Sequence, residues 1–164
     1  MTEENLVKVG MADLKILVAT GSLRTTGLGS CVGLTLYDPV TKIAGMAHVM
    51  LPSASIAKEG NLNKAKYADT AIPELIEQMV QAGAVQKRFE AKMAGGAQMF
   101  AFSGNSDMMR IGPRNVEMCT ELLEKLRIPI KSEDTGGNYG RTIELSSDSG
   151  MLSIRSVNKG TKEI

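Results

Sequence analysis

The chain has 164 residues, of which 43% are apolar and 23% charged, with 19 Lys and Arg against 18 Asp and Glu. That balance excludes the basic footprint of a nucleic-acid-binding protein, and no apolar run approaches the ~18 residues of a membrane span. We therefore expect a single soluble domain over residues 1–164 that binds no nucleic acid and does not insert into membranes. The acidic N-terminal residues lack a secretion-signal pattern, so we expect a cytoplasmic protein with reduced cysteines.

Short runs rich in Val, Ile and Leu, bounded by Gly, Pro, Asp or Asn, predict strands over residues 14–19, 31–37, 42–50, 88–93, 130–134, 142–145 and 152–157. Helical spacing of apolar residues predicts one helix over residues 69–81 and another over residues 112–127, with Pro113 at its first position. This order predicts an α+β fold in which two main helices pack on a mixed or antiparallel sheet. We expect flexible tails at residues 1–9 and 158–164.

Side chains that bind soft metals are scarce. The chain has one histidine, His48, and two cysteines, Cys31 and Cys119, whereas a structural zinc site needs about four such ligands at short spacings. No group of carboxylates has the spacing of a cation-binding loop. We therefore expect no metal and no cofactor, and any imidazole chemistry must use His48.

Cys31 and His48 lie on the two arms of a predicted hairpin. The connecting residues 37–41 contain Asp38 followed by Pro39, which is typical of a type I turn. If Asp38 pairs with Thr41, Cys31 lies directly opposite His48, with Cβ atoms roughly 4.5–5.5 Å apart. A bulge in the turn that shifted the register by one residue would instead place His48 on the other face.

A thiol next to an imidazole is a nucleophile and a base. An adjacent imidazolium lowers the pKa of a thiol from its usual ~8.5, and the same imidazole can protonate a leaving group. The glycine-rich residues 27–30 precede Cys31, and such a bend lets backbone N–H groups converge on an oxyanion. On these grounds, acyl transfer by Cys31 and a purely structural role for Cys31 are supported equally. Cys119 lies in an apolar helix stripe, and we interpret it as a core residue.

Six motifs, in order, resemble the CheD family of chemoreceptor glutamine deamidases. They are residues 25–32 (TTGLGSCV), 47–52 (AHVMLP), 66–69 (KYAD), 91–100 (AKMAGGAQMF), 111–115 (IGPRN) and 134–137 (DTGG). The resemblance extends from about residue 10 to residue 157, which is nearly the whole chain.

The resemblance implies site residues and a reaction. Cys31 would be the nucleophile, His48 the general base and acid, and Thr25 the residue that orients His48, although Thr26 beside it leaves the choice of threonine open. Gly29 and Ser30 would support the oxyanion loop. The implied reaction converts glutamines of chemoreceptor cytoplasmic domains to glutamate through a Cys31 thioester, without a cofactor. The implied fold is an α/β sandwich similar to the catalytic domain of cytotoxic necrotizing factor toxins.

The resemblance also implies partners: chemoreceptors and CheC, the phosphatase that acts on CheY-P. Phe102 is a candidate anchor for CheC, and a core position is its alternative. Two other functions stay open from the sequence. The chain would be mainly a non-catalytic adaptor that binds receptors and CheC, or a thiol esterase acting on receptor glutamyl methyl esters.

Overall fold

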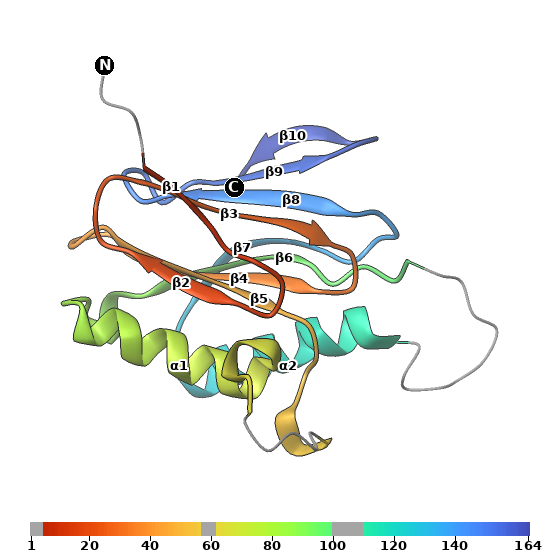
Figure 1. Cartoon of the computed structure of the whole chain (residues 1–164), viewed down its shortest axis with the longest axis horizontal. Helices are drawn as coiled ribbons and strands as arrows, with labels where there is room; N and C mark the ends of the chain where they lie inside the picture. Colours follow the sequence, from red (N-terminus) through yellow and green to blue (C-terminus); the bar gives the residue numbers. More distant parts are fainter. Residues whose placement is uncertain (1–4, 57–61, 100–109) are drawn as a thin grey trace.

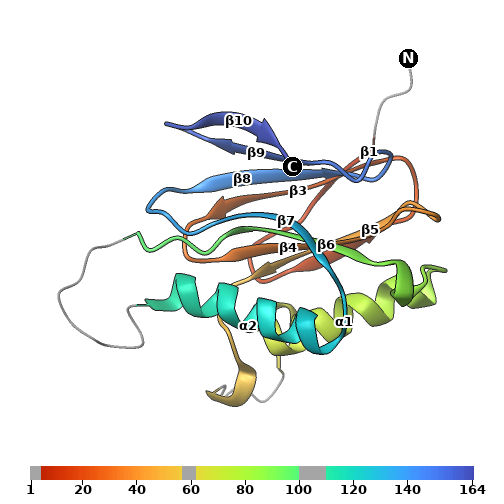
Figure 2. The same cartoon turned by 180° about the vertical axis from the view of Figure 1, so that it is seen from behind.

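The computed structural model describes residues 5–56, 62–99 and 110–164, which form three layers (Figures 1 and 2). One outer layer is a sheet with the strand order β1 (Asn5–Lys8), β3 (Gly21–Leu28), β8 (Arg141–Ser146), β9 (Leu152–Ser156) and β10 (Gly160–Glu163), called here the outer sheet. The middle layer, the central sheet, has the order β2 (Leu14–Leu17), β5 (Ile43–Val49), β4 (Val32–Asp38), β6 (Glu90–Gly95) and β7 (Ile130–Thr135). The third layer holds helices α1 (Ala68–Gln81) and α2 (Ile111–Lys125).

Both sheets are mixed, because β1 pairs with β3 and β6 pairs with β7 in parallel, whereas the other pairs are antiparallel. The predicted α+β class with two main helices is therefore confirmed. The predicted single sheet is in fact two sheets packed face to face. The similarity to the necrotizing factor toxins stays a prediction.

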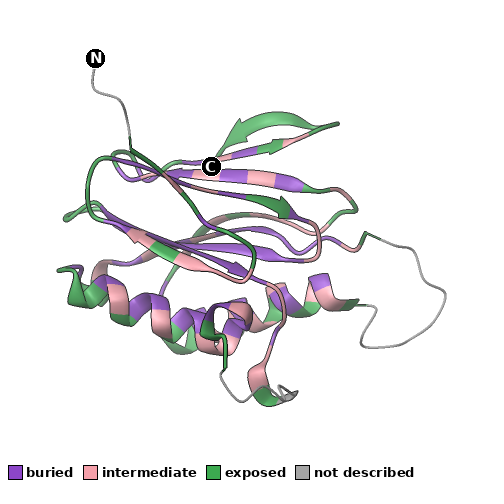
Figure 3. Ribbon diagram, in the orientation of Figure 1, coloured by how far each residue is buried: buried purple, intermediate pink, exposed green. Residues whose placement is uncertain are grey.

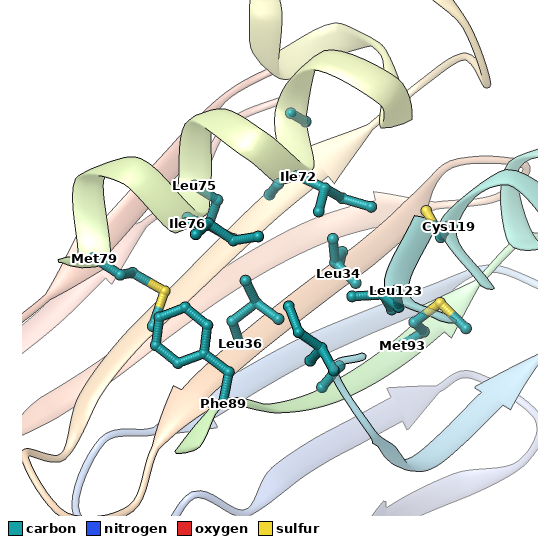
Figure 4. Packing of buried hydrophobic residues seen from close by; sticks show 14 of the residues in the cluster. Leu34, Leu36, Ile72, Leu75, Ile76, Met79, Phe89, Met93, Cys119 and Leu123 are labelled. Carbon is teal, nitrogen blue, oxygen red and sulfur yellow. The ribbon is translucent and has the colours of Figure 1, made fainter. Parts of the chain in front are cut away.

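Two layers of side chains fill the spaces between the three layers. Every residue of β4 and of β5 is buried (Figure 3), since the central sheet is covered on both faces. On the helix side, Leu34 and Leu36 of β4 meet Ile72 and Leu75 of α1 (Figure 4). The predicted core position of Cys119 is confirmed: its side chain is fully buried in this helix-side cluster, and burial raises the pKa of its thiol to about 12.

Strand β3 was not predicted, and it carries Thr25. Of its eight residues, only Leu23 and Leu28 have large apolar side chains, and both are buried. One serine and one threonine are each next to a glycine. A sheet with one face in water needs apolar residues only at alternate positions, so the strand shows no continuous apolar run. A register shift between Thr25 and Leu28, with Gly27 at φ 72°, weakens the pattern further.

Two short strands lie in the segments where we expected flexible tails. Strand β1 pairs with β3 and strand β10 pairs with β9, and both lie at the edges of the outer sheet. All four residues of β10 are exposed, and β1 has one partly buried residue. Short, polar edge strands carry no hydrophobic pattern, so composition alone does not distinguish them from tails. Within the described ranges, no helix is long and apolar enough to cross a membrane.

Candidate functional site

The β4–β5 hairpin carries the histidine and ends next to the cysteine, in a register that differs from the predicted one. His48 pairs with Gly33, and Asp38 pairs with Ile43. The turn therefore has two more residues than expected; Lys42 adopts φ 60° and donates its N–H to the Asp38 carbonyl at 2.7 Å. The prediction that Cys31 lies directly opposite His48 is wrong by two residues.

A shift of two residues keeps the facing of every side chain, since side chains alternate along a strand. Cys31 belongs to the cluster of buried residues between the two sheets, which also includes Tyr37 and Met46. His48, two residues after Met46 on β5, reaches Thr25 of the outer sheet from the same face. The central sheet thus directs the cysteine and the histidine toward the same inter-sheet space.

His48 has one nitrogen bonded and one free. Its Nδ1 lies 2.7 Å from Thr25 Oγ1, and that hydroxyl donates to the Val9 carbonyl at 2.8 Å. A hydroxyl has one proton, so the bond to Val9 requires Nδ1 of His48 to carry its own proton and donate it to Thr25. The neutral ring then has an unprotonated Nε2, which is buried and has no hydrogen-bond partner in the part of the chain that the structure describes.

Thr25 rather than Thr26 is the partner of His48. Thr25 is 2% exposed and faces the inter-sheet space, whereas Thr26 is exposed on the outer surface. The alternation of side chains along β3 decides this question, which the sequence left open. The Val9 carbonyl had no sequence signal at all, because any residue supplies a backbone oxygen.

Backbone and side-chain donors fix the loop that carries Cys31, residues 29–31. The carbonyl of Gly29 accepts from Ala97 N at 2.9 Å, and that of Cys31 accepts from Gly96 N at 2.9 Å. The carbonyl between them, on Ser30, accepts from Asn115 Nδ2 at 3.0 Å. In the described ranges, the N–H groups of Ser30 and Cys31 donate to no other residue, so both stay available to an oxyanion.

Burial sets the charge state of both groups. Burial raises the pKa of the Cys31 thiol, and the hydrogen bond from its own backbone N–H offsets only part of this. Burial also lowers the pKa of the His48 imidazole. Both directions favour a neutral thiol and a neutral imidazole. Burial therefore acts against the expected thiolate–imidazolium pair, which stays a prediction.

The remaining expected site residues differ in what the structure shows. Gly29 and Ser30 are half-buried in the loop before Cys31. A side chain on Gly29 would meet the side chain of Met99. Phe102 lies outside the described residues. In the described ranges there is no group of three or more His, Cys, Asp or Glu side chains placed to hold a metal ion.

Comparison with known proteins bears on this arrangement. Residues 50–156 match the family model described as CheD chemotactic sensory transduction. The chain is 54% identical over 160 residues to the chemoreceptor glutamine deamidase CheD of Halalkalibacterium halodurans, covering 98% of this chain and 99% of that one. This chain belongs to the CheD family.

Other CheD proteins extend the match over the site. The CheD of Bacillus subtilis, also named a chemoreceptor glutamine deamidase, is 51% identical over 163 residues, which cover 99% of this chain and 98% of that one. A probable CheD of Caldanaerobacter subterraneus is 53% identical over 162 residues, with 99% of both chains covered. The family model matches only residues after His48, so the full-length matches to these relatives are what include the strands of Thr25, Cys31 and His48.

Proposed function

We propose that the chain is a protein-glutamine deamidase that converts glutamine side chains of chemoreceptor cytoplasmic domains to glutamate. The names of the CheD relatives support the substrate class. The observation that carries the chemistry is the hydrogen bond between Thr25 and His48, which leaves Nε2 of His48 unprotonated, and without a partner among the described residues, on the face where Cys31 lies. These residues supply a nucleophile, a base and a group that orients the base.

The first half of the reaction forms a thioester and releases ammonia. As the Cys31 sulfur attacks the carbonyl carbon of the glutamine side chain, its proton passes to Nε2 of His48. The carbonyl oxygen becomes an oxyanion and accepts from the N–H groups of Ser30 and Cys31. The tetrahedral intermediate collapses, the protonated His48 gives its proton to the departing nitrogen, and ammonia leaves.

The second half hydrolyses the thioester. His48 takes a proton from a water molecule whose oxygen attacks the thioester carbon. When the carbon–sulfur bond breaks, the Cys31 sulfur regains a proton from His48 and the substrate leaves as glutamate. Thr25 holds the ring in one tautomer through both halves, so that Nε2 is always the nitrogen that exchanges protons.

Intact-mass measurement of a chemoreceptor cytoplasmic fragment tests this function. Incubation with the wild-type chain is expected to raise the fragment mass by the difference between a hydroxyl and an amino group at each modified glutamine. The Cys31→Ala variant is expected to leave the mass unchanged, whereas Cys119→Ala, which removes the buried thiol of α2, is expected to act like the wild type. Equal fragment masses after wild type and Cys31→Ala would reject the enzyme.

The other functions implied by the family resemblance stay predictions. An adaptor that binds chemoreceptors and CheC needs no thiol, so Cys31→Ala would keep all of its activity. An esterase would form the same thioester from a glutamyl methyl ester but release methanol, and a methylated receptor fragment measures this in the same assay. The anchoring of CheC by Phe102 is tested by Phe102→Glu, and the cytoplasmic location also stays a prediction.

A further inference from the structure

Asn115, on the second turn of α2, has no role in the reaction described so far and is fully buried. Its Nδ2 donates to the Ser30 carbonyl at 3.0 Å and to the Met50 carbonyl at 3.0 Å. Ser30 precedes the nucleophile, and Met50 follows the histidine by two residues on the continuation of β5. One side chain from the helix layer therefore joins the segment of Cys31 to the segment of His48.

The bond to Ser30 determines where the Cys31 amide points. In a trans peptide group the carbonyl oxygen and the following N–H lie on opposite edges of one plane. Because Asn115 holds the oxygen of the Ser30–Cys31 peptide, it turns the N–H of Cys31 to the other edge. That N–H lies at the sulfur of Cys31, where it acts on the pKa of the thiol. The oxyanion donor is thus aimed by a side chain that does not touch the substrate.

Two close contacts bring α2 near enough for Asn115 to reach. A Cβ atom on Gly112 would lie 2.1 Å from the carbonyl oxygen of Ala97, and one on Gly96 would lie 2.3 Å from Cγ2 of Val116. Only glycine fits at these two positions without movement of the helix. The same segment, Gly96 and Ala97, donates the N–H groups that hold the carbonyls of Cys31 and Gly29.

The Oδ1 atom of Asn115 argues against a role in stability alone. It is buried and has no hydrogen-bond partner among the described residues. A buried amide oxygen without a partner lowers the stability of the fold. The fold therefore does not satisfy every hydrogen-bonding atom of this side chain, whereas its Nδ2 donates both of its hydrogens to the two segments of the site.

We propose that Asn115 is a positioning residue of the deamidation reaction, which aims the Cys31 N–H at the oxyanion and fixes the cysteine segment relative to the histidine segment. This inference rests on the proposed function. A misdirected oxyanion donor slows acyl chemistry strongly, whereas it affects a reaction that forms no oxyanion only through its smaller effect on the pKa of the Cys31 thiol. Alkylation of Cys31 by iodoacetamide is such a reaction, because the sulfur displaces iodide from a saturated carbon.

The test compares both reactions in Asn115→Asp and Asn115→Ala, made in the full chain. Asn115→Asp keeps the shape and loses the donor; Asn115→Ala also removes the unpartnered Oδ1. For both, kcat for deamidation of the receptor fragment is expected to fall about 10²-fold, with KM close to wild type and a much smaller decrease in the alkylation rate of Cys31. Cys119→Ala, one turn further along α2 and without a hydrogen bond to the site, is the control for disturbing the helix and is expected to keep kcat.

Unchanged kcat in both variants would overturn the proposal. So would parallel losses of kcat, alkylation rate and thermal stability, or the failure of both variants to fold, since each of these outcomes shows a purely structural side chain. Failure of the proposed function gives a different result, because the wild-type chain itself would then leave the mass of the receptor fragment unchanged.

Discussion

The hydroxyl of Thr25 holds the His48 ring without bringing a charge to it. A carboxylate at that position would stabilise the imidazolium and raise the pKa of the histidine. The neutral hydroxyl does not oppose the burial that lowers this pKa. In the proposed reaction, His48 is therefore available as a base in mildly acidic solution, and the thiol of Cys31 stays protonated until His48 takes its proton.

The pH dependence of the two groups follows from these directions. Protonation of His48 removes the base, so kcat/KM is expected to fall on the acid side with an inflection below the ordinary histidine value of 6.5. Alkylation of Cys31 is expected to increase with a midpoint above the ordinary pKa of a thiol, because burial raises the pKa at which the thiolate forms. A midpoint in the neutral range would instead show a thiolate–imidazolium pair.

Loss of the Thr25 hydroxyl is expected to affect both activity and stability. Thr25→Val keeps the shape but leaves the Val9 carbonyl and Nδ1 of His48 buried without partners, which costs about 1–3 kcal/mol in the free energy of unfolding. The tautomer is then no longer fixed, and kcat is expected to fall about 10²-fold. Urea unfolding and the mass assay measure the two effects.

Two neighbouring substitutions control that experiment. Thr25→Ser restores the hydroxyl and is expected to keep most of the activity, while Thr26→Val changes an exposed side chain one residue away and is expected to behave as wild type. Equal losses in Thr25→Val and Thr26→Val would contradict the assigned role of Thr25.

Among the helices and strands, those with a clear pattern of apolar residues could be predicted from the sequence. Helices α1 and α2 and the strands of the central sheet have long apolar stripes or runs, and they are found within a few residues of their predicted positions. Strand β3 has no such run, so its contribution of Thr25 came only from the family resemblance. The predicted hairpin register was wrong because Lys42 adopts φ 60°, and lysine is not a residue type that favours this conformation.

Sequence patterns also do not predict the long-range contacts of the site. The sequence motif that contains Asn115 was recognisable, but its hydrogen bond to Ser30 joins residues 85 positions apart. Such a contact depends on how α2 packs against β4 and β6, which periodicity does not specify. The core position of Cys119 was predictable from its apolar helix stripe, whereas Cys31, which follows a glycine-rich bend, stays the predicted nucleophile.

The end of strand β6 requires glycine at position 95, and substitution there tests how this strand packs against the loop of Cys31. A Cβ on Gly95 would lie 2.3 Å from the carbonyl oxygen of Cys31, and the backbone is at φ 104°. Gly95→Ala is expected to destabilise the fold and to reduce kcat, because the segment that carries Cys31 must move. Urea unfolding and the deamidation assay measure both.

Gly136→Ala is the matched control. Gly136 also has a positive φ, of 86°, but a Cβ there meets nothing within 4 Å. Its substitution is expected to cost about 1–2 kcal/mol from backbone strain alone and to leave kcat intact. If Gly95→Ala were no more harmful than Gly136→Ala, close packing against Cys31 would not explain the glycine.

For the molecule as a whole, Asp38 links the hairpin to the segment that follows α1. It is fully buried, accepts from Arg88 Nε at 2.9 Å and Nη2 at 2.8 Å, and accepts from the N–H of Val85 at 2.9 Å and of Val40 at 3.0 Å. Burial by itself raises the pKa of Asp38, but these hydrogen bonds outweigh it and hold the pKa well below its usual range. The carboxylate therefore stabilises the folded state only while it is ionised.

Acid unfolding is expected to reflect this group. Because the pKa of Asp38 is lower in the folded state, its carboxylate stabilises the fold at pH values above the unfolded-state pKa of about 3.9. This stabilisation is lost as the pH falls further. Asp38→Asn is expected to lower the free energy of unfolding at pH 7 and to weaken its dependence on pH in acid. Asp148→Asn removes an exposed partner of Lys42 and is expected to change little. Similar effects of the two substitutions would contradict the role of Asp38.

Each of the three layers supplies a part of the site. Thr25 comes from the outer sheet and His48 from the central sheet. Cys31 directly precedes β4 of the central sheet, and Asn115 comes from the helix layer. A chain in which one layer has not yet docked has a cysteine and a histidine but no fixed tautomer or no aimed N–H group. Such a chain would therefore lack the complete geometry of the proposed deamidation site. The layered fold thus completes the proposed site only when all three layers have docked.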